Sequence, residues 1–134
     1  MPLDSIDVEA IKKGLEAKGI NCAIELSRDI VEQADLGISE YDFGIAELGC
    51  IAQDATDVYK RLVSSLCPVH LAIIRTHTLV DTFEDSLSLL KDKYGDQVPA
   101  YFAYVAGPSK TADIERVLTI GVHGPGKIIV ICID

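Results

Sequence analysis

The sequence predicts an α/β fold with a mainly parallel sheet flanked by helices, and three observations lead to this prediction. Short apolar segments alternate with amphipathic ones along most of the 134 residues, as in chains built from strand–helix units. The last segment, KIIVICID, holds six consecutive apolar residues, which is typical of a central parallel strand buried on both faces. The chain also has the usual length of one domain and shows no repeat or linker, so we expect a single domain over residues 1–134.

The chain is predicted to begin with a helix over residues 5–18, SIDVEAIKKGLEAK, whose amide groups Ser5 can cap. NCAIEL then favours a strand, SRDIVEQA a short helix capped by Ser27, and DLGIS a second strand. The next segment, DFGIAELGCIAQ, is typical of a strand or of a strand–turn–strand unit. Its small side chains favour the close approach of a helix or a ligand. Residues 54–67 stay ambiguous, with a helical turn around VYKRLVSSL.

The second half contains the clearest helix of the chain. VHLAIIR, which follows Pro68, predicts a buried strand. In DTFEDSLSLLKDKYG, Thr82 and Asp85 resemble a capping box, an apolar stripe follows, and Gly95 ends the helix. AYFAYVAG is the next predicted strand, and KIIVICID is the last. Since ligands bind at the carboxyl ends of strands in such sheets, we expect functional side chains in the connecting loops.

Composition and charge exclude several classes of function. The net charge is −9, and residues 1–58 carry all of it, with 13 acidic and 4 basic side chains. An acidic half repels phosphate backbones, so nucleic-acid binding is not expected. No apolar run is long enough for a membrane span, and the early acids of MPLDSIDVEAIKK argue against a secretory signal. We therefore expect a cytoplasmic protein that binds neither nucleic acid nor membranes.

The four cysteines, Cys22, Cys50, Cys67 and Cys132, form no C-x-x-C pair. This spacing argues against an iron–sulfur cluster or a zinc knuckle, so we expect no metal and no cofactor. Within its apolar run, Cys132 is interpreted as a small core residue.

The segment AGPSKTADIERVL is the first candidate site. It is typical of a strand, a Gly-Pro turn and then a helix, with Ser109 or Thr111 at the helix N-terminus and Lys110 beside it. Free amide groups at such a terminus attract anions, although the spacing matches neither a Walker loop nor G-x-G-x-x-G. Asp113 either projects into a pocket, where it would suit a hydroxyl or an amine, or only favours the helix dipole. Alternatively, all three oxygen-bearing side chains are merely helix caps.

Two further candidates are His123 and Glu47. GVHGPGK holds His123 between glycines that allow unusual backbone angles, and a histidine in this setting can act as acid or base. The alternative is a simple surface histidine. Glu47 is either solvated beyond the end of its strand or held in a pocket, where burial would raise its pKa. His70 and His77 flank an apolar strand and are interpreted as polar residues at its ends.

Four segments, GIAELGC, CPVHLAIIR, AGPSKTADIE and GVHGPGKIIVICI, occur in the order in which they resemble the LUD (lactate utilization) domain. The resemblance covers about residues 37–134. It implies a fold similar to the NagB/RpiA/CoA-transferase-like α/β fold. It also implies a part in a three-component system that oxidises L-lactate to pyruvate, in which two partner proteins carry the iron–sulfur chemistry. The family commonly has E-T-G-T where this chain has Glu47-Leu48-Gly49-Cys50, and family members commonly have a longer N-terminus.

The resemblance and the chemistry of the residues together point to specific positions of this chain, with Lys110 expected from its place beside the predicted helix N-terminus and not from the motif. We expect Glu47 and His123 as catalytic residues, and Gly107, Ser109, Lys110, Thr111, Asp113, Gly121 and Gly124 as ligand-binding residues. His70, Pro108, Glu115 and Pro125 complete the motif set.

Three functions follow from the sequence. The first is a subunit that binds a small carboxylate or a phosphorylated metabolite and works with iron–sulfur partners. The second, by analogy of fold alone, is a stand-alone acyl- or CoA-transferase or an isomerase, with Glu47 as nucleophile or base. The third is a non-catalytic sensing or assembly module, in which the apolar composition would suit burial against a partner or a second copy.

Overall fold

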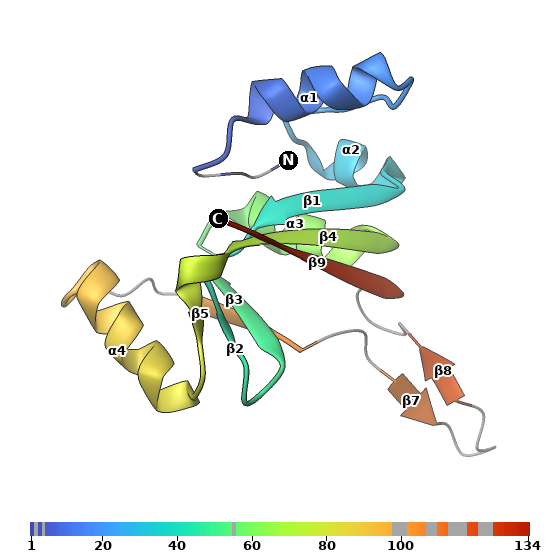
Figure 1. Ribbon diagram of the computed structural model, residues 1–134. Coiled ribbons are helices and arrows are strands. Elements are labelled where there is room, and N and C mark those ends of the chain that lie inside the picture. Colours follow the sequence, from blue (N-terminus) through green and yellow to red (C-terminus); the bar gives the residue numbers. More distant parts are fainter. Residues whose placement is uncertain are drawn as a thin grey trace.

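The computed structural model of the protein describes residues 1, 3, 5–54, 56–97, 102–106 and 125–134, and the backbone of residues 110–112 and 118–120 (Figure 1). The helices are α1 (Val8–Ala17), α2 (Arg28–Gln33), α3 (Val58–Leu66) and α4 (Phe83–Tyr94), with a short 3-10 turn η1 (Thr76–Thr78). The strands are β1 (Leu36–Glu40), β2 (Phe43–Ile45), β3 (Cys50–Asp54), β4 (Val69–Arg75), β5 (Leu79–Val80), β6 (Phe102–Val105), β7 (Lys110–Ala112), β8 (Leu118–Ile120) and β9 (Lys127–Ile133). This element order confirms the predicted α/β class.

A parallel sheet with the order β1-β4-β9 forms the centre of the domain. Its register pairs Leu36 with Val69 and Val69 with Lys127, so the three strands start level with one another. β4 is the central strand, and its VHLAIIR sequence is apolar because both of its faces are covered. The prediction that β9 is a central buried strand was wrong. β9 lies at the edge of this sheet, and most of its side chains are exposed.

A second sheet with the order β5-β2-β3-β6 packs beside the first. β2 and β3 form an antiparallel hairpin, which confirms the predicted strand–turn–strand unit, and β6 extends it antiparallel to β3. Its core contains Phe43, whose ring stacks on that of Phe102 at a centroid distance of 5.4 Å. α4 packs against this second sheet and lies at the lower left of Figure 1.

The two faces of the central sheet are covered by different elements. α1 lies over one face, where its apolar stripe packs near Ile38 and Ile73 (Figure 1). On the other face, α3 covers the amino half of the sheet, and Gly37 lies directly under it. Ile74 packs against the second sheet on that face. A side chain on Gly37 would place its Cβ 2.8 Å from the Cys67 sulfur, which explains the glycine at this position.

The helix starts follow the predicted capping chemistry with one exception. Ser27 and Thr82 cap α2 and α4 as predicted, and Gly95 ends α4 with a φ of 59°. α3 resolves the ambiguity around VYKRLVSSL in favour of a helix. α1, however, is capped by Asp7, because the hydroxyl of Ser5 donates to the Glu40 carboxylate instead.

The strand predicted in NCAIEL was wrong. Residues 21–26 form an irregular connection that packs Cys22 and Ile24 under α1. Among the residues that the structure describes, no helix combines the length and the apolarity needed to cross a bilayer.

Candidate functional site

The turn that joins β2 to β3 carries Glu47, the first predicted catalytic residue. β2 ends at Ile45, and the whole turn from Ala46 to Gly49 is exposed. Glu47 is therefore solvated, which was one of the two predicted alternatives. The turn is held against the chain that enters α4, because the Glu47 backbone N–H donates to the Asp81 carbonyl over 2.8 Å. Gly49 closes the turn at a φ of 60°, a value that favours glycine.

The Glu47 carboxylate lies at the N-terminus of α4. Its Oε2 accepts a hydrogen bond from the backbone N–H of Phe83 over 3.3 Å. The Thr82 hydroxyl accepts from the N–H of Asp85 over 3.1 Å. A negative charge at this position interacts favourably with the helix dipole and satisfies an amide that would otherwise bond to water. In this arrangement the protein's own carboxylate occupies the place that an anion would take at α4.

The end of β6 lies beside the same turn. Val105 pairs with Ile51 in an antiparallel ladder, and Ile51 is the second residue of β3, immediately after the turn. The Gly-Pro-Ser motif starts at Gly107, two positions beyond Val105. The topology therefore brings the Glu47 turn, the N-terminus of α4 and the entrance to the first signature motif to one end of the second sheet. Tyr104 and Phe83 border this end, with their ring centroids 6.2 Å apart.

The prediction that a helix starts directly after the Gly-Pro turn was wrong. Lys110 and Thr111 belong to β7, which pairs with β8 in an antiparallel ladder with Thr111 opposite Thr119. Thr111 therefore does not sit at a helix N-terminus. The other predicted residues of this motif, Gly107, Ser109 and Asp113, lie outside the described residues, together with Pro108 and Glu115.

The second signature motif ends at the amino edge of the central sheet. Gly121, His123 and Gly124 lie outside the described residues. Pro125 is buried, and the N–H of Gly126 donates to the Pro68 carbonyl over 2.9 Å. This bond fixes the start of β9 level with the start of β4. Among the described residues, the two motifs thus attach to different sheets, and the structure does not show Glu47 and His123 together.

His70 was interpreted as a polar residue at the end of a strand, and this was wrong. Its side chain is fully buried under α3. Nε2 lies 2.9 Å from the Ser39 hydroxyl, and Nδ1 lies 3.2 Å from the Val63 carbonyl. Burial lowers the pKa of His70, and the bond to Val63 opposes this shift only in part. In a neutral ring, Nδ1 donates to the Val63 carbonyl and Nε2 accepts from the Ser39 hydroxyl, so both ring nitrogens have a hydrogen-bond partner.

A buried polar cluster surrounds His70, and sequence reasoning did not find it. The ring of Tyr41 meets that of His70 edge-on at a centroid distance of 5.7 Å. Burial raises the pKa of Tyr41 to about 12, an effect that the nearby Ser39 hydroxyl partly offsets. Among the described residues, the Tyr41 hydroxyl and Gln53 Oε1 have no hydrogen-bond partner of ordinary geometry. Ser39, Gln53 and His70 are polar residues inside otherwise apolar strands, but nothing local in the sequence showed that they are buried.

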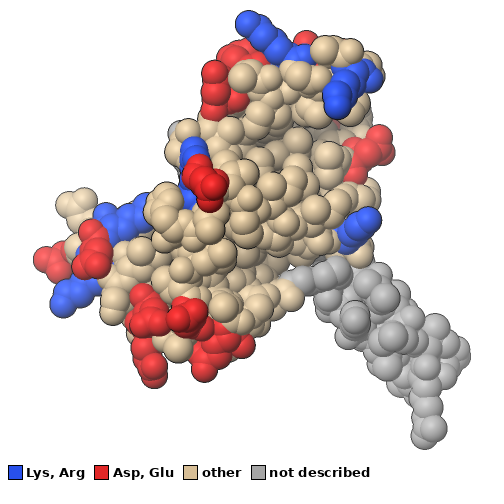
Figure 2. All heavy atoms as spheres, in the orientation of Figure 1, with Lys and Arg blue, Asp and Glu red and all other residues tan. Residues whose placement is uncertain are grey.

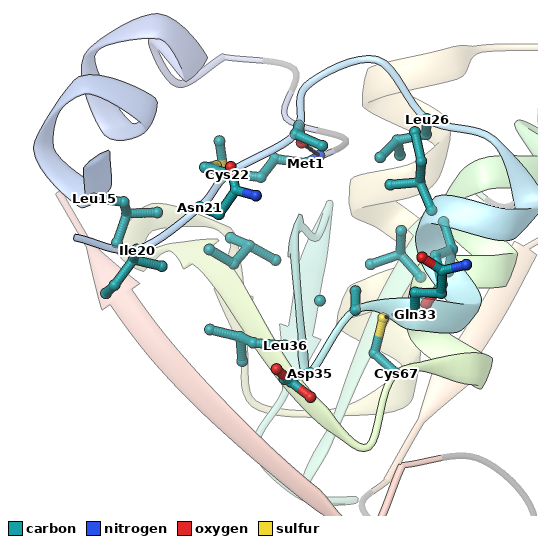
Figure 3. Close-up of a pocket in the computed structure, with 17 residues that line it drawn as sticks. Met1, Leu15, Ile20, Asn21, Cys22, Leu26, Gln33, Asp35, Leu36 and Cys67 are labelled. Atoms are coloured by element: carbon teal, nitrogen blue, oxygen red, sulfur yellow. Dashed lines mark hydrogen bonds between the residues drawn. The ribbon is translucent and has the colours of Figure 1, made fainter. Parts of the chain in front are cut away.

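Two cavities open elsewhere on the described surface. One, of about 580 Å³, lies between α1, α2 and the start of β1. Figure 3 shows its largely apolar wall, with the sulfur of Cys67 pointing inward and Asp35 at the rim. The other, of about 360 Å³, lies at the carboxyl ends of β1 and β4 and is polar, with Arg75, His77 and Lys93 in its wall. Glu47 lines neither of them.

The cysteines are not grouped around a common centre. Cys50 and Cys67 are buried, and burial raises the pKa of both thiols. Cys132 is exposed, so its interpretation as a core residue was wrong, because β9 is an edge strand. Within the described part of the chain, no three His, Cys, Asp or Glu side chains are placed to hold a metal ion together.

Comparison with known proteins gives a consistent result. The family model of the LUD domain matches residues 4–133. The chain is 35% identical over 105 residues to "Lactate utilization protein C" of Bacillus licheniformis, which covers 77% of this chain and 44% of that protein. It is 36% identical over 107 residues to the protein of that name from Oceanobacillus iheyensis, covering 78% of this chain and 46% of that protein.

The fold has a solved counterpart. A crystal structure of a DUF162 family protein from Deinococcus radiodurans superposes with a TM-score of 0.58. The two sequences are 18% identical, and the match covers 100% of this chain and 87% of that one. At this identity the likeness concerns the fold. The chain spans under half the length of the curated relatives named above. Since the family model covers nearly all of the sequence, the chain belongs to the LUD domain family.

Proposed function

We propose that this LUD domain is a small-ligand-binding subunit that takes part in the oxidation of lactate or a related 2-hydroxy acid. The observation that carries the proposal is the similarity to proteins called lactate utilization protein C, at 35% and 36% identity over three quarters of the chain. The ligand is a small carboxylate or a phosphorylated metabolite, and the place of action is the cytoplasm. The partners are proteins that carry iron–sulfur clusters.

The geometry at the end of the second sheet supports a ligand site that includes the first signature motif. The Glu47 turn and the N-terminus of α4 form one wall, held by the bond from Phe83 to Glu47. β6 ends at Val105 at the same end, two positions before the Gly-Pro-Ser motif in the sequence. Ser109, Lys110 and Thr111 would supply hydroxyl donors and one cation, which are groups suited to a carboxylate or a phosphate. His123 would then serve as the acid or base next to the bound 2-hydroxy acid.

The proposed partner proteins would accept the electrons that the oxidation releases. The oxidation of a 2-hydroxy acid to a 2-keto acid releases two electrons, which must pass to an acceptor. None of the proposed ligand-binding side chains is a redox group, so the electrons would pass to the clusters of the partners. This subunit would bind and orient the acid, and the partners would accept the electrons.

The test is thermal unfolding against lactate, pyruvate, other 2-hydroxy and 2-keto acids, sugar phosphates and CoA esters. A ligand at a hundredfold excess over its Kd should stabilise the fold by about 2.7 kcal/mol. The stabilisation should disappear in His123→Ala and persist in His77→Ala. His77 is a matched control because it is exposed and lines the polar cavity at the other sheet. Loss in His77→Ala alone would move the site to that cavity and overturn the assignment to the signature motifs.

A second candidate function is a stand-alone acyl- or CoA-transferase or an isomerase, and the exposure of Glu47 favours it. A nucleophilic or basic carboxylate must be accessible, and Glu47 is accessible on its turn. One observation counts against this second function: one oxygen of the Glu47 carboxylate already accepts a hydrogen bond from the Phe83 amide. Transferase activity with a CoA ester that is lost in Glu47→Gln would support this second function, whereas activity that survives the substitution would exclude the mechanism.

A further inference from the structure

β9 is an apolar edge strand that is open to solvent on both faces. It pairs with β4 along one side, and in the described part of the chain no strand pairs with its other side. Ile129 and Ile131 are 36% and 41% exposed on one face, and Val130 is 46% exposed on the other. Figure 2 shows the consequence as a wide area without charged side chains, over the place where β4 and β9 lie in Figure 1.

Beyond its first residue, Lys127, this edge lacks the features that usually prevent pairing between molecules. Protected edge strands carry a lysine, a proline or a bulge within the strand, or they are very short. β9 has seven residues, pairs with β4 in an unbroken register, and has no charged residue or proline between Ile128 and Ile133. Charges appear only at the two ends, Lys127 and Asp134. An apolar strand flanked by opposite charges is complementary to a second copy of itself in the antiparallel direction.

We propose that β9 is the dimer interface of this protein, formed by antiparallel pairing with β9 of a second copy. A two-fold axis perpendicular to the sheet keeps the same face of both copies on the same side, so the pair must be centred on a residue. With the centre at Val130 or Ile131, Lys127 of one copy lies within one residue of Asp134 of the other, on both sides of the axis. The two central sheets then join into one continuous sheet, and the exposed side chains of β9 are covered by their counterparts.

The charge distribution agrees with this surface. The excess of acidic side chains lies in residues 1–58, whereas residues 59–134, which include β9, carry equal numbers of acidic and basic side chains. Two copies that meet through β9 therefore do not join their most acidic segments. The proposal concerns assembly and is independent of the ligand and of lactate.

The first experiment measures the oligomeric state by sedimentation across a range of protein concentrations. The unmodified protein should dimerise. Val130→Lys places two ammonium groups opposite each other if the axis passes through Val130, and opposite Cys132 of the other copy if it passes through Ile131. In both registers it should raise the dimer Kd by at least tenfold. The control is Leu87→Lys on α4, which also replaces an exposed apolar side chain, 49% exposed, but outside β9. Leu87→Lys should leave the dimer unchanged, and circular dichroism should show both variants folded.

A charge exchange tests the register without burying a new charge. Lys127→Asp and Asp134→Lys should each weaken the dimer by about tenfold, because two attractive pairs become repulsive. The double variant should regain the original Kd. In a Cys132→Ser background, Val130→Cys or Ile131→Cys should form a disulfide-linked dimer, and the variant that reacts identifies the centre. A protein that stays monomeric at all concentrations, or a dimer unaffected by Val130→Lys, would overturn the proposal.

Discussion

Replacing His70 with phenylalanine tests whether this motif residue has a structural role. The ring is fully buried, with Ser39 bonded at one nitrogen and Val63 at the other. His70→Phe keeps a ring of similar size, so it opens no large cavity. It does remove both hydrogen bonds and leaves the Ser39 hydroxyl and the Val63 carbonyl buried without these partners. The substitution therefore isolates the polar contribution of the imidazole from its contribution to packing.

The expected loss of stability follows from these two bonds. A buried donor or acceptor that loses its partner costs about 1–3 kcal/mol. Two such groups predict a decrease of about 2–6 kcal/mol in the free energy of unfolding for His70→Phe. Ser39→Ala leaves His70 Nε2 without its partner and should cost about 1–3 kcal/mol. The double variant should cost less than the two single losses together, because the Ser39 hydroxyl is no longer present to be left without a partner.

The assay is equilibrium unfolding in urea at several pH values. Burial lowers the pKa of His70 below that of the unfolded chain, so the unfolded state binds a proton more readily. The contribution of His70 is therefore complete above about pH 6.5 and is lost as the pH falls below this value, by at most about 1.4 kcal/mol per pH unit. His70→Phe should lack this component. A change below 0.5 kcal/mol at pH 7.5, or an unchanged pH profile, would refute the buried-histidine account.

Three further predictions concern packing, capping and thiol access. Gly37→Ala should destabilise the fold by about 1–3 kcal/mol in urea unfolding, because the new methyl group would overlap α3, whereas Gly14→Ala, with open space on α1, should stabilise it by about 0.5–1 kcal/mol. Equal effects of the two alanines would contradict the packing described here. Thr82→Ala should cost about 1 kcal/mol through the lost cap of α4, and no loss would show that the Glu47 carboxylate alone suffices there. At protein concentrations well below the dimer Kd, a thiol reagent should modify Cys132 before Cys67 in the folded protein, and the reverse order would contradict the exposure of Cys132 in the single copy.

The sequence predicted much of the fold because most elements carry local signals. Ser27 and Thr82 are residue types that cap helices, and they mark the starts of α2 and α4 in the sequence. The apolar pattern of VHLAIIR predicts the central strand. The strand–turn–strand unit and the solvated position of Glu47 were each one of two predicted alternatives. These features depend on residues that are close in the sequence, which is why a local pattern could predict them.

The errors concern features that depend on distant residues. KIIVICID has the composition of a central strand, but strand order is set by tertiary pairing, and the structure places it at the edge. Ser5 is a good cap by type, yet it donates to Glu40, which lies 35 positions away. His70 gave no sign of burial because its partners come from β1 and α3. For the candidate site, the register of β6 against β3 places Val105, two positions before the first motif, near the Glu47 turn, which no local pattern indicates.

The most direct test of the proposed function is ligand-induced stabilisation of the unmodified protein, His123→Ala and His77→Ala in parallel. The account predicts that one small carboxylate or phosphorylated metabolite raises the Tm of the unmodified protein and of His77→Ala, with no effect on His123→Ala. Stabilisation that persists in His123→Ala, or none from any compound at millimolar concentration, would contradict a ligand site at the signature motifs.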